Sequence, residues 1–108
     1  MDCKNNRENI IIDTNILLYM KKKLAYLNSL LKEFNIYVLN STICEIKDEI
    51  NLDALNYTFL NSKILNVDQG ILHLNGYSIL TNDKRLGRAL KKKGTKVYKI
   101  SHSKYIRS

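Results

Sequence analysis

The chain has 108 residues, of which 44% are hydrophobic, and a formal net charge of +8, so we expect one compact domain over residues 1–108 with one core. No apolar run approaches the length that spans a membrane and no signal-peptide pattern is present, which predicts a soluble, cytoplasmic protein without a membrane partner. Cys3 and Cys44 are too few for a disulfide framework or a zinc site.

The first half of the chain alternates apolar runs with amphipathic segments. Residues 10–15 (IIIDTN) read as a strand buried on both faces that ends at a carboxylate. Residues 16–34 carry apolar side chains at helical spacing, interrupted by the lysines at 21–23, which predicts one helix with a bend. A second apolar strand is predicted over residues 36–39, and a helix opens at residue 41.

The same alternation continues to the end of the core. The predicted order is helix 53–60, strand 63–67, helix 68–75, strand 78–81, helix 83–93 and edge strand 96–100. Gly76 and Gly94 are placed to end the last two helices. Residues 1–8 and 101–108 are polar and aperiodic, so we expect frayed tails around an ordered core of about residues 9–100. Together these elements predict a three-layer α/β fold with a central parallel sheet of about five strands and helices on both faces.

Four carboxylates recur at equivalent places in this alternation. Asp13 and Asp83 follow predicted strands, Asp68 follows another, and Glu45 lies in the first turn of a helix that follows a fourth. Because the carboxyl ends of parallel strands meet at one edge of a sheet, we expect these side chains to converge there. Converging carboxylates repel one another unless a cation neutralises them, and oxygen ligands suit Mg²⁺ or Mn²⁺.

Each carboxylate also has a purely structural explanation. Asp13, Asp68 and Asp83 are all placed to cap helices, and Thr42 with Glu45 fits a capping box. Ser, Thr or Asn would cap as well, however, and this chain is rich in asparagine. The repeated choice of a carboxylate therefore favours a shared site.

The acidic residues gather in the middle of the sequence, and the basic residues gather at its end. Residues 41–70 hold two basic and five acidic residues, whereas residues 71–108 hold ten basic and one acidic. An acidic focus beside a basic surface is what a metal-using enzyme acting on phosphate esters needs. A solvated, lysine-rich exterior is the alternative explanation of the same charge.

One helix carries much of this basic charge. Its residues Lys84, Arg88, Lys91 and Lys92 form a stripe at helical spacing, with Arg85 beside it. The stripe starts next to Asp83, so we expect Lys84, Arg85, Arg88, Lys91 and Lys92 to contact the phosphate backbone of a nucleic acid that leads into the site.

Several segments together resemble the PIN-domain nucleases. These are IIIDTN, the helix from Ser41 to Glu45, VDQGIL with Asp68, and ILTNDKRL with Asp83, in the right order over residues 10–100. The most specific piece is TNDKRLGRALKKKGTKVYKI, because in PIN domains the last aspartate follows a strand ending in Thr and precedes a helix and a final strand.

The resemblance implies a PIN-like fold and metal-dependent endoribonuclease activity, as in VapC-type toxins and the PIN nucleases of ribosomal RNA processing. By the same resemblance, the metal-binding and catalytic residues are Asp13, Glu45, Asp68 and Asp83, and Thr14, Asn15 and Thr81 line the site. The implied cofactor is Mg²⁺ or Mn²⁺. The implied partners are RNA, a second copy of the chain, and an antitoxin or a ribosome-assembly protein.

Two features depart from the family pattern. Many PIN domains carry another acidic residue two positions after the equivalent of Asp83, where this chain has Arg85. The chain is also shorter than most members between the second and third strands. These departures leave two alternatives open, a PIN-like RNA-binding or assembly subunit that does not cleave, and a small acidic-site phosphatase of another doubly wound family.

Overall fold

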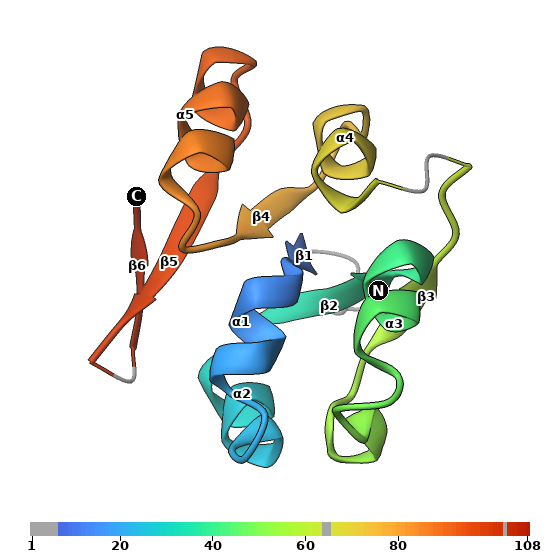
Figure 1. The fold of residues 1–108 in the computed structure, drawn as a ribbon. Coiled ribbons are helices and arrows are strands. Elements are labelled where there is room, and N and C mark those ends of the chain that lie inside the picture. The colour runs from blue at the N-terminus through green and yellow to red at the C-terminus, as the bar shows by residue number, and fades with distance from the viewer. Residues whose placement is uncertain (1–6, 64–65, 103) are drawn as a thin grey trace, which may run out of the picture.

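The sequence folds into a six-stranded sheet with helices on both faces, as a computed structural model shows (Figure 1). The structure describes residues 7–63, 66–102 and 104–108, and gives the backbone but not the side chain of Asp68. The strands are β1 (Glu8–Ile12), β2 (Phe34–Leu39), β3 (Thr58–Leu60), β4 (Ser78–Leu80), β5 (Val97–Ser101) and β6 (Lys104–Arg107). Their order is β3-β2-β1-β4-β5-β6, with every neighbouring pair parallel except β5 and β6.

Five helices cover the two faces of this sheet. They are α1 (Thr14–Tyr19), α2 (Leu24–Leu30), α3 (Asn40–Ile46), α4 (Val67–Leu72) and α5 (Lys84–Lys92), with a 3₁₀ turn, η2, at Leu52–Ala54. Helices α1, α2 and α3 pack on one face, and α4 and α5 pack on the other (Figure 1). Across the part of the chain that is described, no helix has the length and apolar character needed to cross a membrane.

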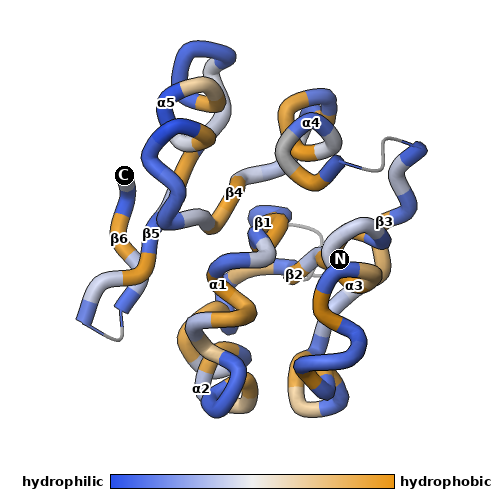
Figure 2. The backbone as a smooth tube through the Cα atoms, viewed as in Figure 1, coloured by the Kyte–Doolittle hydropathy of each residue, from blue (hydrophilic) through white to orange (hydrophobic). Residues whose placement is uncertain are grey.

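The central strand β1 separates two hydrophobic cores. Ile10 and Ile12 belong to the core under α1, α2 and α3, Ile11 belongs to the core under α4 and α5, and all three are fully buried. Figure 2 shows the hydrophobic residues along the central strands and alternating with polar residues around the helices. The continuous apolar run of β1 is therefore explained by burial on both faces, and the predicted three-layer α/β class is confirmed.

The helix predicted over residues 16–34 is divided, as the three lysines indicated. Helix α1 ends at Tyr19, with Met20 as its C-cap, and α2 begins after Lys23. The predicted end of this region is wrong, because α2 stops at Leu30 and Phe34 already belongs to β2. Phe34 packs edge-to-face against Tyr98 and Tyr105, and this tertiary contact favours the strand over another helical turn.

The region between α3 and α4 also differs from the prediction. A helix over residues 53–60 was expected, but only η2 forms there, and Thr58–Leu60 becomes β3 by pairing in parallel with the end of β2. A short apolar stretch is ambiguous between helix and strand, and an available strand edge decides the outcome. Of the strand predicted over residues 63–67, residues 64 and 65 lie outside the described part and Val67 begins α4.

The carboxyl-terminal residues form regular structure, against the expectation of a frayed tail over 101–108. Lys104–Arg107 forms β6, so β5 is not an edge strand. His102 takes a positive φ of 51° at the turn between them. Tyr105 packs edge-to-face on Phe34 and Tyr98, which are far away in the sequence. This aromatic contact gives β6 an attachment that the polar sequence pattern did not show.

Candidate active site

Asp13 sits at the carboxyl end of the central strand and is almost completely buried, with 3% of its surface exposed. It caps α1, and its Oδ1 accepts a hydrogen bond of 2.9 Å from the backbone N–H of Thr14. Its Oδ2 accepts a bond of 2.6 Å from the hydroxyl of Thr81, which follows the neighbouring strand β4. Both oxygens of the carboxylate are therefore fixed in position.

Thr81 also connects Asp13 to the second predicted carboxylate. The hydroxyl oxygen of Thr81 accepts a bond of 3.1 Å from the backbone N–H of Asp83. Asp83 is half-buried and caps α5, where its Oδ1 accepts from the backbone N–H groups of Arg85 and Leu86 at 2.9 and 3.2 Å. The cap was predicted correctly, and it uses only one of the two carboxylate oxygens.

The capping explanation is wrong for the other two carboxylates. Helix α3 has Leu39 at its N-cap with no side-chain cap, so Thr42 and Glu45 form no capping box. The Thr42 side chain instead meets the hydroxyl of Thr14, which donates to it at 3.1 Å. At α4 the cap is Asn66, whose side chain accepts from the N–H of Gln69 at 3.1 Å, and Asp68 lies inside the helix.

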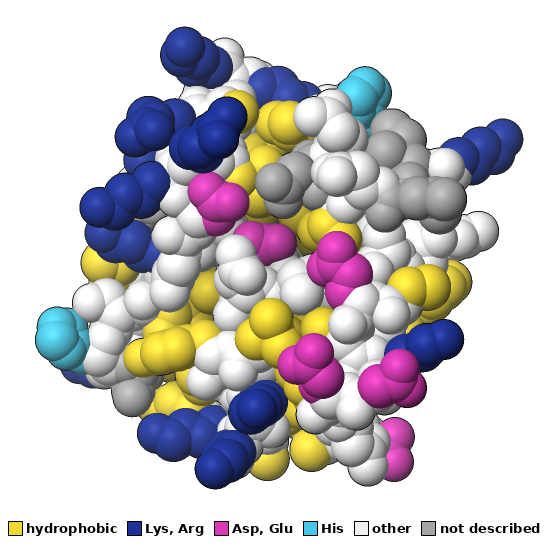
Figure 3. All heavy atoms as spheres, viewed as in Figure 1, with side chains coloured by type: hydrophobic (Ala, Val, Ile, Leu, Met, Phe, Trp, Pro, Cys, Tyr) yellow, Lys and Arg dark blue, Asp and Glu magenta, His cyan; other side chains and the backbone are white. Residues whose placement is uncertain are grey.

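A hollow of about 340 Å³ brings three of the predicted carboxylates together. Its lining residues are Asp13, Thr14, Asn15, Leu18, Glu45, Ile46, Glu49, Asn66, Val67 and Asp83. Asp13, Glu45 and Asp83 thus reach it from three separate elements, and two of the expected lining residues, Thr14 and Asn15, are also present. We call this the acidic hollow. Figure 3 shows one face of the molecule, with acidic side chains across its middle and basic side chains beside them.

Two further acidic residues, Asp68 and Glu49, belong to segments that line the acidic hollow. The side chain of Asp68 is outside the described part, but its helical neighbour Val67 lines the hollow. Glu49 was missed by the sequence reasoning, although it follows Glu45 at the i, i+4 spacing that places two residues on one side. Thr81, expected to line the site, acts through its hydrogen bonds to Asp13 and Asp83.

The donor set fits a hard divalent cation in its chemistry. All the candidate ligands are carboxylate, hydroxyl or amide oxygens, which Mg²⁺ and Mn²⁺ prefer. Among the described residues, no three carboxylate, histidine or cysteine side chains lie close enough to hold one ion as placed. Glu45 is exposed and has rotatable bonds, so it is the member whose side chain would move most easily toward Asp13 and Asp83.

A second hollow, of about 280 Å³, lies between α5 and β5 on the other side of Asp83. Its lining residues are Thr81, Asn82, Asp83, Lys84, Gly87, Arg88, Lys91, Val97, Lys99, Ile100, Ser101 and Ser108. We call this the basic hollow. Lys84, Arg88 and Lys91 belong to the predicted basic stripe, whereas Lys99 on β5 was not identified from the sequence. Arg85 and Lys92 are exposed and line neither hollow.

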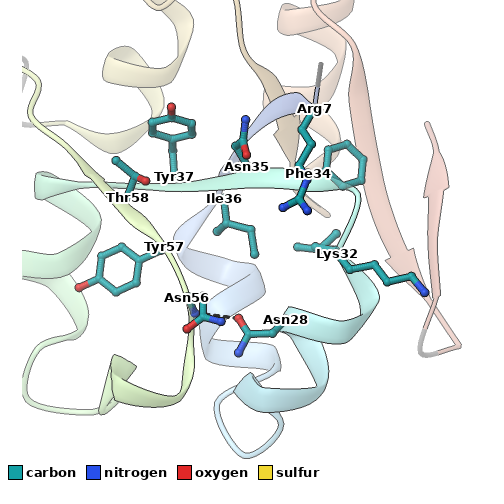
Figure 4. A pocket seen from close by; sticks show the side chains of 11 residues that line it. Arg7, Asn28, Lys32, Phe34, Asn35, Ile36, Tyr37, Asn56, Tyr57 and Thr58 are labelled. Carbon is teal, nitrogen blue, oxygen red and sulfur yellow. Dashed lines mark hydrogen bonds between the residues drawn. The ribbon is translucent and has the colours of Figure 1, made fainter. Parts of the chain in front are cut away.

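A more spacious hollow of about 660 Å³ lies at the amino-terminal end of β2, away from the acidic hollow (Figure 4). It is lined by amide and aromatic side chains, including Asn35, Tyr37 and Tyr57, and by the basic residues Arg7 and Lys32. No carboxylate lines it among the described residues, so it does not compete with the acidic hollow as a hydrolytic site.

Comparison with known proteins supports the architecture. No family model and no curated protein matches the sequence. Among solved structures, the PIN domain endonuclease Utp24 matches with a TM-score of 0.75 and 18% sequence identity, over 93% of this chain and 90% of that one. At this level of identity the likeness concerns the fold. This chain therefore has the PIN fold, as the sequence resemblance predicted.

Proposed function

We propose that the protein is a metal-dependent endoribonuclease that hydrolyses phosphodiester bonds of RNA at the acidic hollow. The observation that carries this proposal is that Asp13, Glu45 and Asp83 come from three separate elements and line one hollow at the carboxyl edge of the sheet. That edge is where open α/β sheets bind ligands. Oxygen-rich sites beside cationic surfaces are suited to phosphodiester hydrolysis.

The residues in and around the acidic hollow would have different roles in the reaction. Asp13, Glu45, Asp68 and Asp83 would bind Mg²⁺ or Mn²⁺, which when bound supplies Lewis-acid activation of a water molecule and of the phosphate. The Thr81 hydroxyl holds Asp13 in place by donating to its Oδ2, and the backbone N–H of Thr14 holds the same carboxylate by donating to its Oδ1. Fixed ligands need no reorganisation during the reaction, which favours catalysis.

The choice of RNA as the substrate rests on the resemblance to PIN ribonucleases and on the high density of basic residues after residue 70. This chemistry agrees with a toxin-type role, in which an antitoxin is the partner, and with an RNA-processing role in ribosome assembly. It also agrees with a homodimer. Arg85 stands where many PIN domains have an acidic residue, and it lines neither hollow. The acidic hollow is therefore lined by its carboxylates without a contribution from Arg85.

The test is cleavage of a fluorescently labelled single-stranded RNA with Mn²⁺, with Mg²⁺ and with EDTA. Activity should require the metal and should fall about 100-fold or more in Asp13→Asn, because even the removal of a residue that only orients a metal ligand costs roughly 10- to 100-fold. Glu33→Gln, which removes an exposed carboxylate in the turn before β2, is the matched control and should cleave like the parent.

Two results would contradict the proposal. Cleavage that persists equally in EDTA or in Asp13→Asn would exclude the acidic hollow as the reaction site. Tight RNA binding by the parent protein with no cleavage under any metal would instead favour the non-cleaving RNA-binding subunit.

A further inference from the structure

In the lining of the basic hollow, the cationic side chains outnumber the carboxylate side chains by four to one, the one carboxylate being Asp83. Four cationic side chains line it, Lys84, Arg88 and Lys91 from α5 and Lys99 from β5. Within the ranges 7–63, 66–102 and 104–108, the ion pair that forms is Lys96 with Glu8, so none of these four cations has a carboxylate partner there. Like charges gathered in one concave place repel one another, and an anion that enters relieves the repulsion.

Asp83 lines both hollows, so the two hollows are adjacent and meet at this residue. Its N–H donates to Thr81, and its Oδ1 caps the start of α5, the helix that supplies three of the four cations. A polyanionic strand whose reacting phosphate lies in the acidic hollow therefore meets the basic hollow as it leaves past Asp83. The carboxylates of the acidic hollow can bind cations. The lysine and arginine side chains of the basic hollow can bind a phosphate directly, without a bound cation.

We infer that the basic hollow is a binding subsite for one phosphate and its ribose in the RNA strand, next to the phosphodiester that is cleaved. This inference rests on the proposed function, and it adds Lys99 as a substrate-positioning residue. Ser101 and Ser108 also line the hollow, and their side chains carry hydroxyl groups that can bind a sugar or a phosphate.

The subsite has features that a solvated lysine face lacks. Lys99 comes from a strand, not from the helix that carries the other three cations, so the charges surround a space and do not simply cover a helix surface. Gly87, which is buried, also lines the hollow and adds no side chain to it. Charge-assisted hydrogen bonds from several directions to one phosphate are stronger than the interaction made by a single exposed lysine.

Binding of a mononucleotide tests the subsite without cleavage or metal. The protein used is the full chain carrying Asp13→Asn, labelled with ¹⁵N, in low salt with EDTA. Uridine 5′-monophosphate should produce saturable amide shifts at Gly87, Lys99 and Ser101, and uridine without phosphate should not. Lys91→Gln combined with Lys99→Gln should weaken the binding about tenfold or more, because the variant lacks two charge-assisted hydrogen-bond donors. Lys104→Gln, a lysine on β6 outside the hollow, is the matched control and should bind like its parent.

A second measurement uses single-stranded RNA and the dependence of its affinity on salt. Losing the contact with one neutralised phosphate should reduce the magnitude of the slope of log K against log salt by about 0.7. The Lys91→Gln/Lys99→Gln variant should show this reduction and Lys104→Gln should not.

Four outcomes would overturn the inference. These are no saturable shift with the mononucleotide, equal shifts with uridine, equal affinity for inorganic phosphate alone, and an unchanged salt slope in the double variant. Because none of these measurements requires a metal or cleavage, failure of the subsite is distinguishable from failure of the proposed nuclease activity.

Discussion

The hydroxyl of Thr81 donates a hydrogen bond of 2.6 Å to Oδ2 of Asp13, joining the ends of the neighbouring strands β4 and β1. Both residues are buried, with 2% and 3% of their surfaces exposed. The same hydroxyl accepts from the N–H of Asp83 at 3.1 Å. One threonine side chain thus sets the position of two carboxylates that are 70 residues apart in the chain.

Replacing Thr81 with valine should damage both stability and activity. Thr81→Val keeps the shape but removes a hydrogen bond to a buried carboxylate, which should lower the free energy of unfolding by about 1.5–3 kcal/mol. Thr81→Ser retains the hydroxyl and should keep most of the activity. Urea denaturation and RNA cleavage measure the two effects. Equal activity in the two variants would show that the hydrogen bond between Thr81 and Asp13 has no part in the reaction.

Substitutions at Asp83 separate its role as a helix cap from its role as a metal ligand. Asparagine caps a helix as well as aspartate does, so Asp83→Asn should retain the stability measured without metal. Asp83→Ala removes the acceptor for two N–H groups and should cost about 1 kcal/mol. Both variants should lose cleavage. An active Asp83→Asn would mean that Asp83 is only a cap.

A divalent cation should stabilise the folded protein, because it relieves the repulsion between the carboxylates of the acidic hollow. Mn²⁺ at about 100 times its dissociation constant should add about 2.7 kcal/mol, which is seen as a rise in Tm. The rise should disappear in an Asp13→Asn/Asp83→Asn double variant and persist in Glu33→Gln. The same rise in the double variant would place the cation elsewhere.

The stability should also depend on alkaline pH through Tyr98. Burial, followed by the hydrogen bond that the Tyr98 hydroxyl donates to Glu8 at 3.1 Å, raises the pKa of Tyr98 above its ordinary value of 10.0. A raised pKa in the folded state favours the protonated phenol. Its contribution to stability is therefore complete below pH 10.0 and is lost as the pH rises through the folded-state value.

Measurements of Tm from about pH 8 to about pH 11 test this linkage. The parent protein should lose stability above pH 10.0 more steeply than Tyr98→Phe, which has no phenol at this position. Tyr19→Phe, at a tyrosine that is 67% exposed, is the control and should follow the parent. Identical pH profiles for the parent and Tyr98→Phe would contradict the assignment.

Gly87→Ala should stabilise the protein. A Cβ at this position would lie 3.7 Å from Cγ1 of Val97, an ordinary van der Waals distance, so the interior of α5 accepts the methyl group. The gain should be about 0.5–1 kcal/mol, because alanine loses less conformational entropy in a helix than glycine does. Gly94→Ala should instead be destabilising, since φ is +90° there. Urea denaturation distinguishes the two variants, and a less stable Gly87→Ala would show that the contact with Val97 is strained.

The sequence alone determined the features that depend on local chemistry. The run of three isoleucines identified β1, because β-branched residues favour strands and a strand buried on both faces has apolar residues at successive positions. The helix α5 was predicted at both ends. Asp83 caps its start, and at its end Gly94 has a φ of +90° while the N–H groups of Gly94 and Thr95 bond back to Lys91 and Leu90. Such signals lie within a few residues of the structure they specify.

Tertiary structure decided the elements whose sequences are compatible with more than one conformation. Thr58–Leu60 became a strand because the edge of β2 was available to pair with it. Lys104–Arg107 became a strand because Tyr105 found Phe34 and Tyr98 on other strands. Neither partner could be read from the local pattern, since hydrogen-bond partners and aromatic contacts come from distant parts of the chain.

In the candidate site too, some features were visible in the sequence and others came only from the tertiary structure. The spacing of Asp13, Glu45 and Asp83 after buried strands was visible in the sequence, and so was most of the basic stripe. Only the folded chain placed Glu49 in the acidic hollow and Lys99 with Arg88 and Lys91 in the basic hollow. A residue's type and its distance along the chain are properties of the sequence, whereas the walls of a hollow are set by how strands and helices pack against one another.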